Sequence, residues 1–170
     1  MMSVVGHTEA TAELDWLAGA RFAADLPSQV IELDATDGTG LPDLLETVLP
    51  VMSDRLLDAL SRGGADNIDV YPVVLRRADT GQRWDHHKAV NVIGNIDAVD
   101  MERSRFTRTP TGAAEFESIV IDPRATGGSR CFRLAQGPIH VVVDEQVAKA
   151  VAAVELTAVL LQRTEDYDGF

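Results

Sequence analysis

Cysteine is almost absent from this chain, because Cys131 is the only one among 170 residues. A single thiol cannot form an internal disulfide, so the fold has to be held together by its apolar core. A chain of this length can bury roughly 70% of the surface that its unfolded state exposes, which is enough for one stable domain. Cys131 lies in an apolar run with Phe132 and Leu134, which favours a buried structural thiol over a nucleophile.

Long hydrophobic runs are also missing. No segment approaches the roughly 20 apolar residues that are needed to cross a bilayer. The N-terminal residues lack the basic segment followed by an apolar segment that is typical of a signal peptide. We therefore expect a cytoplasmic protein that does not act at a membrane.

Basic side chains are scarce in the N-terminal third. Residues 1–54 contain ten acidic side chains and one basic one, Arg21, whereas residues 55–134 contain eleven acidic and twelve basic ones. The net charge of the whole chain is −12. Nucleic-acid binding is disfavoured, because it requires a clustered basic face. The acidic third either serves solubility or attracts a basic protein partner.

Catalytic and metal-binding motifs are absent as well. The four histidines do not have the spacing of metal ligands, and the neighbours His86 and His87 would point to opposite faces of a strand. The Asp-rich and Gly-rich residues 34–40 lack the twelve-residue calcium-loop pattern. We therefore expect no catalytic residue, no metal and no cofactor. A hydrolase built around Asp97, Asp100 or these two histidines remains the weaker alternative.

The clearest structural signals lie between residues 50 and 94. Ser53 is suited to cap a helix that contains leucines at positions 56, 57 and 60 and stops at Gly63-Gly64. Residues 68–77 and 84–93 are rich in β-branched side chains and predict two strands joined by a turn. Both faces of the first strand are apolar, but Pro72 predicts an edge position or a bulge.

The flanking sequence predicts further elements. We expect a short helix over residues 14–22, a helix over residues 43–49 that begins after Pro42, a helix over residues 145–154 capped by Asp144, and a strand over residues 156–162. The predicted fold class is α+β, a single domain with a mostly antiparallel or mixed sheet and helices packed on it. Its expected parts are an acidic, partly ordered segment (1–44), an α+β domain (45–162) and a flexible acidic tail (163–170).

Several short motifs resemble those of a known family. They are Pro50-Val51-Met52-Ser53 with Arg55 and Leu60, then Asn67-Ile68 and Tyr71-Pro72-Val73, then Lys88 to Gly94 (KAVNVIG), then Phe116 to Asp122 (FESIVID), and finally Phe132-Arg133-Leu134. Together they resemble immunity-protein family eleven of bacterial polymorphic toxin systems, a myxobacterial-prototype domain that was formerly a domain of unknown function. The resemblance covers about residues 45–160 and leaves the first forty residues unmatched.

This resemblance implies an α+β domain that is encoded beside a toxin gene and that binds and neutralises its cognate toxin. It implies no catalysis and no cofactor, and it assigns no toxin-binding residue. Because toxins that act on nucleic acid are often basic, we expect an acidic partner-binding surface that contains Asp34, Asp37, Asp43 and Glu46. A regulatory or scaffold module that binds another protein is the main alternative, and the sequence leaves open whether the protein forms a homodimer.

Overall fold

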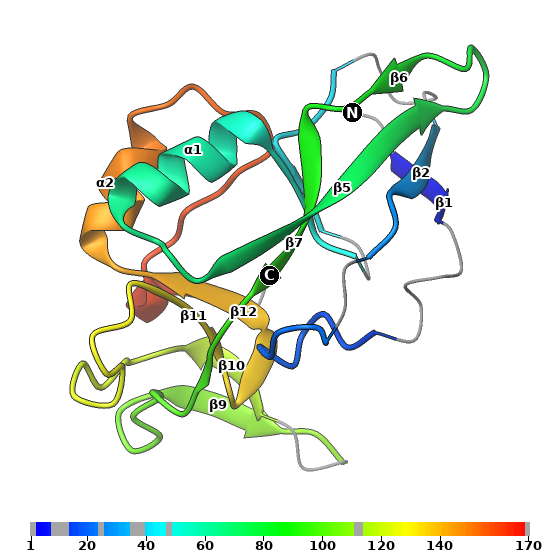
Figure 1. Ribbon diagram of the computed structural model, residues 1–170. Coiled ribbons are helices and arrows are strands. Elements are labelled where there is room, and N and C mark those ends of the chain that lie inside the picture. Colours follow the sequence, from blue (N-terminus) through cyan, green and yellow to red (C-terminus); the bar gives the residue numbers. More distant parts are fainter. Residues whose placement is uncertain are drawn as a thin grey trace.

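The structure is a computed structural model that describes residues 3–7, 14–23, 26–34, 40–46, 49–110 and 114–168. Within these ranges, two α-helices and a set of mostly short strands form an α+β fold in which strands predominate (Figure 1). This confirms the fold class that the sequence predicts. No helix in the described part of the chain is long and apolar enough to cross a membrane.

The largest sheet has seven strands of mixed direction. They are β1 (Ser3–His7), β2 (Gln29–Asp34), β3 (Leu44–Leu45), β4 (Val51–Ser53), β5 (Ile68–Arg77), β6 (Arg83–Trp84) and β7 (His87–Val92). Their spatial order is β1-β2-β5-β7-β4-β3, and β6 pairs with the second half of β5. Strands β2 and β5 are parallel, whereas the other pairs are antiparallel. The long strand β5 crosses the middle of the sheet (Figure 1).

Helix α1 (Asp54–Gly63) has the predicted start and stop. The Ser53 hydroxyl accepts a hydrogen bond from the Leu56 N–H at 3.2 Å, and Gly64 ends the helix with φ of +96°, a conformation that glycine adopts without strain. Helix α2 (Glu145–Ala152) is likewise capped by Asp144, which accepts a hydrogen bond from the Val147 N–H at 2.9 Å. These local signals explain why both helices could be predicted.

The two helices lie side by side over one face of the sheet (Figure 1). They approach each other closely at Gly63, where an added Cβ atom would lie 2.5 Å from the Cα atom of Val147. A larger residue at this position would therefore push α2 away. Between the helices and the sheet lies a core of buried side chains, among them Leu56, Leu60, Val90 and Val151.

The opposite face of the same sheet is covered by an irregular segment instead of a helix. Side chains alternate along the strands, so that Ala89 faces the irregular segment while Val90 faces the helices. Trp16 is 2% exposed and packs edge-on against Phe22 and Tyr71, with ring centroids 4.8 and 5.6 Å away. The predicted helix over residues 14–22 is wrong, because the described part of this segment forms turns.

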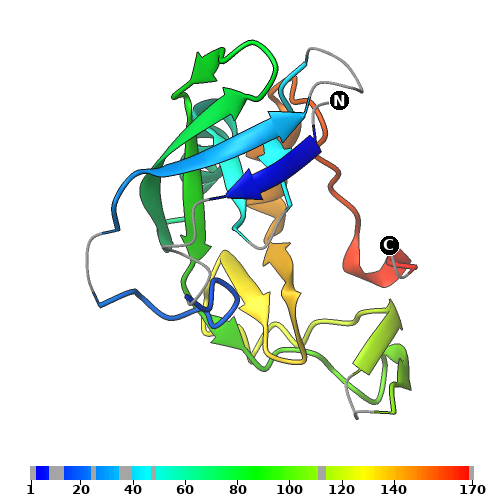
Figure 2. The same cartoon turned by 90° about the vertical axis from the view of Figure 1, so that its right-hand side faces the viewer.

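Two smaller sheets complete the fold. The first contains β8 (Asn95–Ile96), β11 (Cys131–Leu134) and β12 (Gly137–Val143), and the second pairs β9 (Arg105–Arg108) with β10 (Ala114–Ser118). A third core cluster, which includes Phe116, Phe132 and Leu134, fills the space beneath them. Figure 2 shows the C-terminal segment running down to the β9–β10 pair, where the 3-10 helix η2 (Thr164–Asp166) lies. The Ile119 N–H donates to the Thr164 carbonyl at 2.8 Å, which fixes this segment to the chain after β10.

The predicted helix over residues 43–49 is wrong. Leu44 and Leu45 form strand β3, which pairs with β4, and residues 47–48 lie outside the described residues. The Asp43 N–H donates to the Thr157 carbonyl, and the Asp43 carbonyl accepts from the Ser53 N–H. These contacts with distant residues hold the backbone extended, and local sequence patterns contain no information about them.

The predicted strand over residues 156–162 is also wrong, although Thr157 pairs with Asp43 through its N–H and its carbonyl. Ala158 has φ of +59°, which bends the chain immediately after that contact. Farther along, Leu160 is 83% exposed. The predicted strand over residues 84–93 is divided into β6 and β7 by a bend at residues 85–86.

Candidate functional site

Asp43, one of the four predicted partner-binding residues, is a buried structural carboxylate with 2% exposure. Its Oδ1 accepts from the Ser53 hydroxyl at 2.5 Å and from Arg55 Nε at 3.2 Å. Its Oδ2 accepts from Arg55 Nη2 at 2.7 Å and from the Thr157 N–H at 2.8 Å. One side chain thus connects the N-terminus of α1, strand β3 and the C-terminal segment, and its carboxylate is directed to these internal donors.

Opposing effects act on the pKa of Asp43. Burial alone would raise the pKa, but the hydrogen bonds from Ser53, Thr157 and Arg55 outweigh it, so that the pKa lies below the ordinary value. The carboxylate is therefore ionised at neutral pH. Its role is to hold three segments together.

The other predicted partner-binding residues have different positions. Glu46 is exposed, and no ion pair joins it to another described residue. Asp34 is half-buried at the end of β2, and Asp37 lies outside the described residues. Other acidic side chains of the N-terminal third are paired with basic residues from the middle of the chain, namely Glu32 with Arg76 and Asp54 with Lys88. Part of the charge asymmetry therefore serves internal pairing.

The residues of the alternative hydrolase are engaged in separate structural contacts. His87 is 1% exposed, and its Nε2–H donates to the Pro42 carbonyl at 3.0 Å, whereas His86 is exposed. The Asp100 carboxylate accepts from the N–H groups of the following turn, and Asp97 binds Gln136. Within the described residues, no group of three His, Cys, Asp or Glu side chains could hold a metal ion.

The thiol of Cys131 is buried in the core with 1% exposure, as the sequence predicts. Burial raises its pKa to about 11, so that the reactive thiolate is scarce at neutral pH. Cys131 is therefore a core residue.

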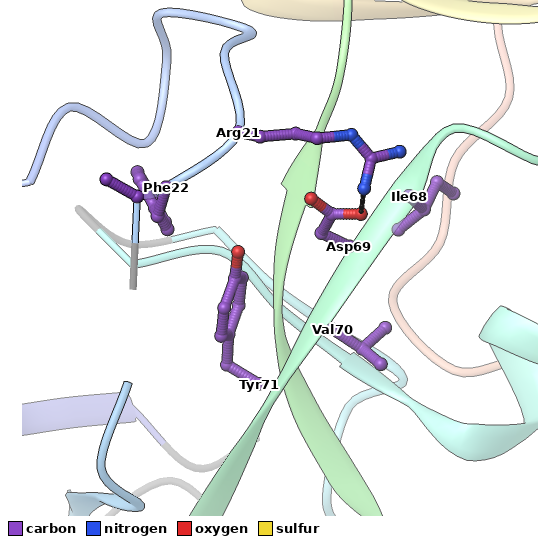
Figure 3. Close-up of a pocket in the computed structure, with 7 residues that line it drawn as sticks. Arg21, Phe22, Ile68, Asp69, Val70 and Tyr71 are labelled. Atoms are coloured by element: carbon purple, nitrogen blue, oxygen red, sulfur yellow. Dashed lines mark hydrogen bonds and ion pairs between the residues drawn. The ribbon is translucent and has the colours of Figure 1, made fainter. Parts of the chain in front are cut away.

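A hollow of about 630 Å³ lies on the Trp16 side of β5 (Figure 3). Its lining comes from residues 21–23 and from the first half of β5, residues 68–71. Arg21 Nη1 donates to Asp69 Oδ1 at 2.8 Å across this hollow, while Phe22 and Tyr71 supply aromatic surface. Because the two charges compensate each other, the described lining of the first hollow is close to neutral and partly apolar.

A second hollow of about 410 Å³ lies between α1 and β5. It contains the carboxylates of Asp54, Asp58 and Asp66 and one basic group, Lys88. Lys88 Nζ lies 3.0 Å from Asp54 Oδ1, and no ion pair joins Asp58 or Asp66 to a described residue. The apolar part of the lining comes from Leu57, Ala65, Ile68 and Val70. The lining of the second hollow therefore combines an excess of acidic side chains with apolar ones.

Sequence reasoning missed both hollows. The helix periodicity places Asp54, Leu57, Asp58 and Ser61 on one side of α1, which was an available signal for the second hollow. The pairing of Arg21 with Asp69 joins residues 48 positions apart, and no local pattern indicates it. Both hollows are open to solvent, which suits contact with another macromolecule better than enclosure of a small ligand.

The fold and these surfaces define an α+β domain with open, partly acidic recesses beside a strand. The sequence model of the immunity protein family (Imm11) matches residues 16–166, and the chain belongs to this family. The match begins well before residue 45, where the resemblance seen in the sequence begins, and it includes Trp16 and strand β2. A search of the curated proteins gave no match.

Proposed function

We propose that this protein is an immunity protein that binds and neutralises a cognate toxin of a bacterial polymorphic toxin system. The complex is stoichiometric, it forms in the cytoplasm, and neutralisation needs no catalysis and no cofactor. Membership of the immunity protein family over residues 16–166 is the observation that carries this proposal. The open recesses beside β5 support it, because they offer a protein partner accessible contact area.

The charge of the chain supports a basic partner. With a net charge of −12, the protein attracts a positively charged toxin over long distances and accelerates the encounter at low salt. In this proposal Asp34, Asp37 and Glu46 contribute to that attraction. Asp43 contributes mainly through the internal contacts that keep β3 in place.

Co-expression tests the function directly. The protein encoded by the adjacent reading frame is expressed in a bacterial host with and without this chain. We expect growth arrest without the chain, recovery with it, and co-purification of the two proteins in a one-to-one complex. The proposal would be contradicted if growth arrest persisted in the presence of this chain and the two proteins formed no complex.

The electrostatic part has its own test. In the double variant with Asp34→Lys and Glu46→Lys we expect slower association with that toxin and a weaker dependence of the association rate on salt. Glu102→Lys is the matched control, because Glu102 is exposed in a turn before β9 and its side chain has no ion pair with a described residue. Equal association rates for the double variant and the unchanged protein would contradict this part.

A further inference from the structure

Among the described strands, the first half of β5 has a neighbour on one side only. On that side, residues 68–72 pair with β7. On the other side, β2 begins at Gln29 beside Val73, so the described strands leave the position next to residues 68–72 vacant. The chain before β2 carries Pro27, whose carbonyl accepts from the Gln29 side chain, and none of its described backbone groups bonds to β5. The vacant position is about 16 Å long, at about 3.3 Å per residue.

Along a strand, the backbone N–H and carbonyl groups of successive residues point alternately to the two neighbouring strands, and we call this alternation the hydrogen-bonding phase. In β5 this phase points the groups of every second residue into the vacant position. The Val90 N–H donates to the Pro50 carbonyl, so the Val90 backbone faces β4 and away from β5. Val70 lies opposite Val90, and in an antiparallel pair its own N–H and carbonyl must then point away from β7. Ile68 has the same phase. No described residue hydrogen-bonds to the backbone of Ile68 or Val70 on the open side.

Proline and exposure mark this stretch as an open strand edge. Pro72 has the same phase as Val70, so the N–H that proline lacks would have pointed to the open side. Pro72 therefore lies at a strand edge, as proline prefers, although the second half of β5 is in the interior of the sheet. Val70 is 51% exposed. We call residues 68–71, together with the flank that no described strand occupies, the open edge.

The two hollows lie on opposite faces of the open edge and share Ile68 and Val70 in their linings. Successive side chains of a strand point to opposite faces of its sheet. In a strand added here, the residue opposite Val70 would therefore direct its side chain into the second hollow. The residues before and after it would direct theirs into the first hollow. Recognition by strand addition combines such alternate pockets with backbone hydrogen bonds.

Charge determines which segment fits. In the second hollow, Asp58 and Asp66 have no ion pair with a described residue, which favours a lysine or arginine side chain. In the first hollow, Arg21 and Asp69 compensate each other beside Phe22 and Tyr71, which favours an apolar side chain. A second copy of this chain is disfavoured as the occupant, because it would bring its own negative charge next to the acidic side chains of this hollow.

We infer that the open edge of β5 receives an extended segment of the toxin, which pairs with Ile68 and Val70 and alternates a basic side chain with apolar ones. This inference rests on the proposed function. In the bound complex, the toxin contacts the open edge. The net negative charge instead raises the rate at which the two proteins meet.

Amide hydrogen exchange tests the inference residue by residue. In the free protein the Val70 amide exchanges rapidly, whereas the Tyr71 amide, which faces β7, is protected. Binding of the toxin encoded by the adjacent reading frame protects the Val70 amide. A complex in which the Val70 amide still exchanges rapidly overturns the inference and leaves the proposed function intact. Protection that depends on the concentration of this chain alone also overturns it, because the occupant is then a second copy.

Substitutions provide the second test. Val70→Pro removes the donor on the open side and leaves the bonds to β7, and the loss of one hydrogen bond, together with the ring at the contact, weakens toxin binding about tenfold. Val70→Thr keeps the N–H and changes affinity less than about threefold. The double variant with Asp58→Lys and Asp66→Lys also weakens binding, in contrast to Glu102→Lys. Unchanged affinity of the lysine double variant overturns the inference even if Val70→Pro fails to fold.

Discussion

The two faces of the seven-stranded sheet are covered by different means. One face carries α1 and α2, whose ends are fixed by local hydrogen bonds from Ser53 and Asp144. The other face carries the irregular residues 14–23, which are held by contacts with residues far away in the sequence. The Gly94 N–H donates to the Gly19 carbonyl at 2.8 Å, and Asn91 Nδ2 donates to the Ala20 carbonyl at 2.8 Å.

This difference shows where the information for each face lies. The helical face depends on caps and on periodic leucines, which occur within a few residues of each other. The irregular face depends on Trp16, which becomes a core residue only when the strands carrying Tyr71 and Ala89 are assembled beneath it. We therefore expect the irregular face to be as important for stability as the helical one, although its sequence shows no regular element.

Among the substitutions that compare the two faces, removal of the Trp16 side chain has the largest expected effect on stability. Trp16→Ala removes a 2% exposed indole from its contacts with Phe22 and Tyr71 and should lower the free energy of unfolding by about 3–5 kcal/mol. Leu56→Ala on the helical face should cost about 2–5 kcal/mol. Urea unfolding followed by circular dichroism measures both. A loss below about 1 kcal/mol for Trp16→Ala would mean that the irregular segment contributes little to the core.

Asp43 joins the N-terminus of α1 to β3 and the C-terminal segment, and its removal has the next largest effect. Asp43→Ala leaves the Ser53 hydroxyl and the Thr157 N–H without their acceptor and should cost about 2–4 kcal/mol. The matched control is Asp58→Ala, which removes an exposed carboxylate from α1 and should change stability by less than about 0.5 kcal/mol. The same urea experiment at neutral pH checks both values.

Acid unfolding gives a second measurement on Asp43. Its pKa is lower in the folded state, so its stabilising contribution is complete above the ordinary carboxyl pKa of about 4 and is lost as the pH falls through the folded value. The Asp43→Ala variant should lack this part of the acid dependence. An identical slope below pH 4 in both proteins would contradict the assignment.

The sequence was sufficient for the elements whose cause is local. Ser53, Gly64 and Asp144 mark the ends of α1 and α2, and the β-branched residues of β5 mark the longest strand. It was insufficient where a residue is fixed by a distant partner. Asp43 was predicted to begin a helix, but its contacts with Thr157, 114 positions away, hold it in an extended segment before β3. The hollows beside β5 depend on the same kind of long-range assembly.

His87 provides a prediction on the sheet itself. Burial lowers its pKa in the folded state, against the opposing effects of its bond to the Pro42 carbonyl and of Asp43 and Asp54. The unfolded chain therefore binds a proton that the folded chain excludes. Stability is complete above about pH 6.5 and should fall below it by up to about 1.4 kcal/mol per pH unit.

Substitution separates this effect from general acid unfolding. His87→Gln retains a side-chain N–H for the Pro42 carbonyl and should flatten the stability profile between pH 6.5 and pH 5. His86→Gln removes only the smaller charge effect that the exposed neighbour exerts on His87, so it should change the profile much less. Urea unfolding midpoints measured across this pH range check both variants. An equal change of the midpoints with pH in the two variants would contradict the role of His87.

The smallest expected effect concerns the ion pair over the irregular face. Arg21 is 66% exposed and Asp69 is 22% exposed, so their pair should contribute no more than about 1 kcal/mol, and less at high salt. A double-mutant cycle with Arg21→Ala and Asp69→Ala measures this coupling. If the coupling is this small while Trp16→Ala costs several times more, the irregular segment is held by its buried aromatic contacts. A coupling above about 2 kcal/mol would instead mean that the ion pair fixes the segment, and the irregular face would then depend on salt in a way that the helical face does not.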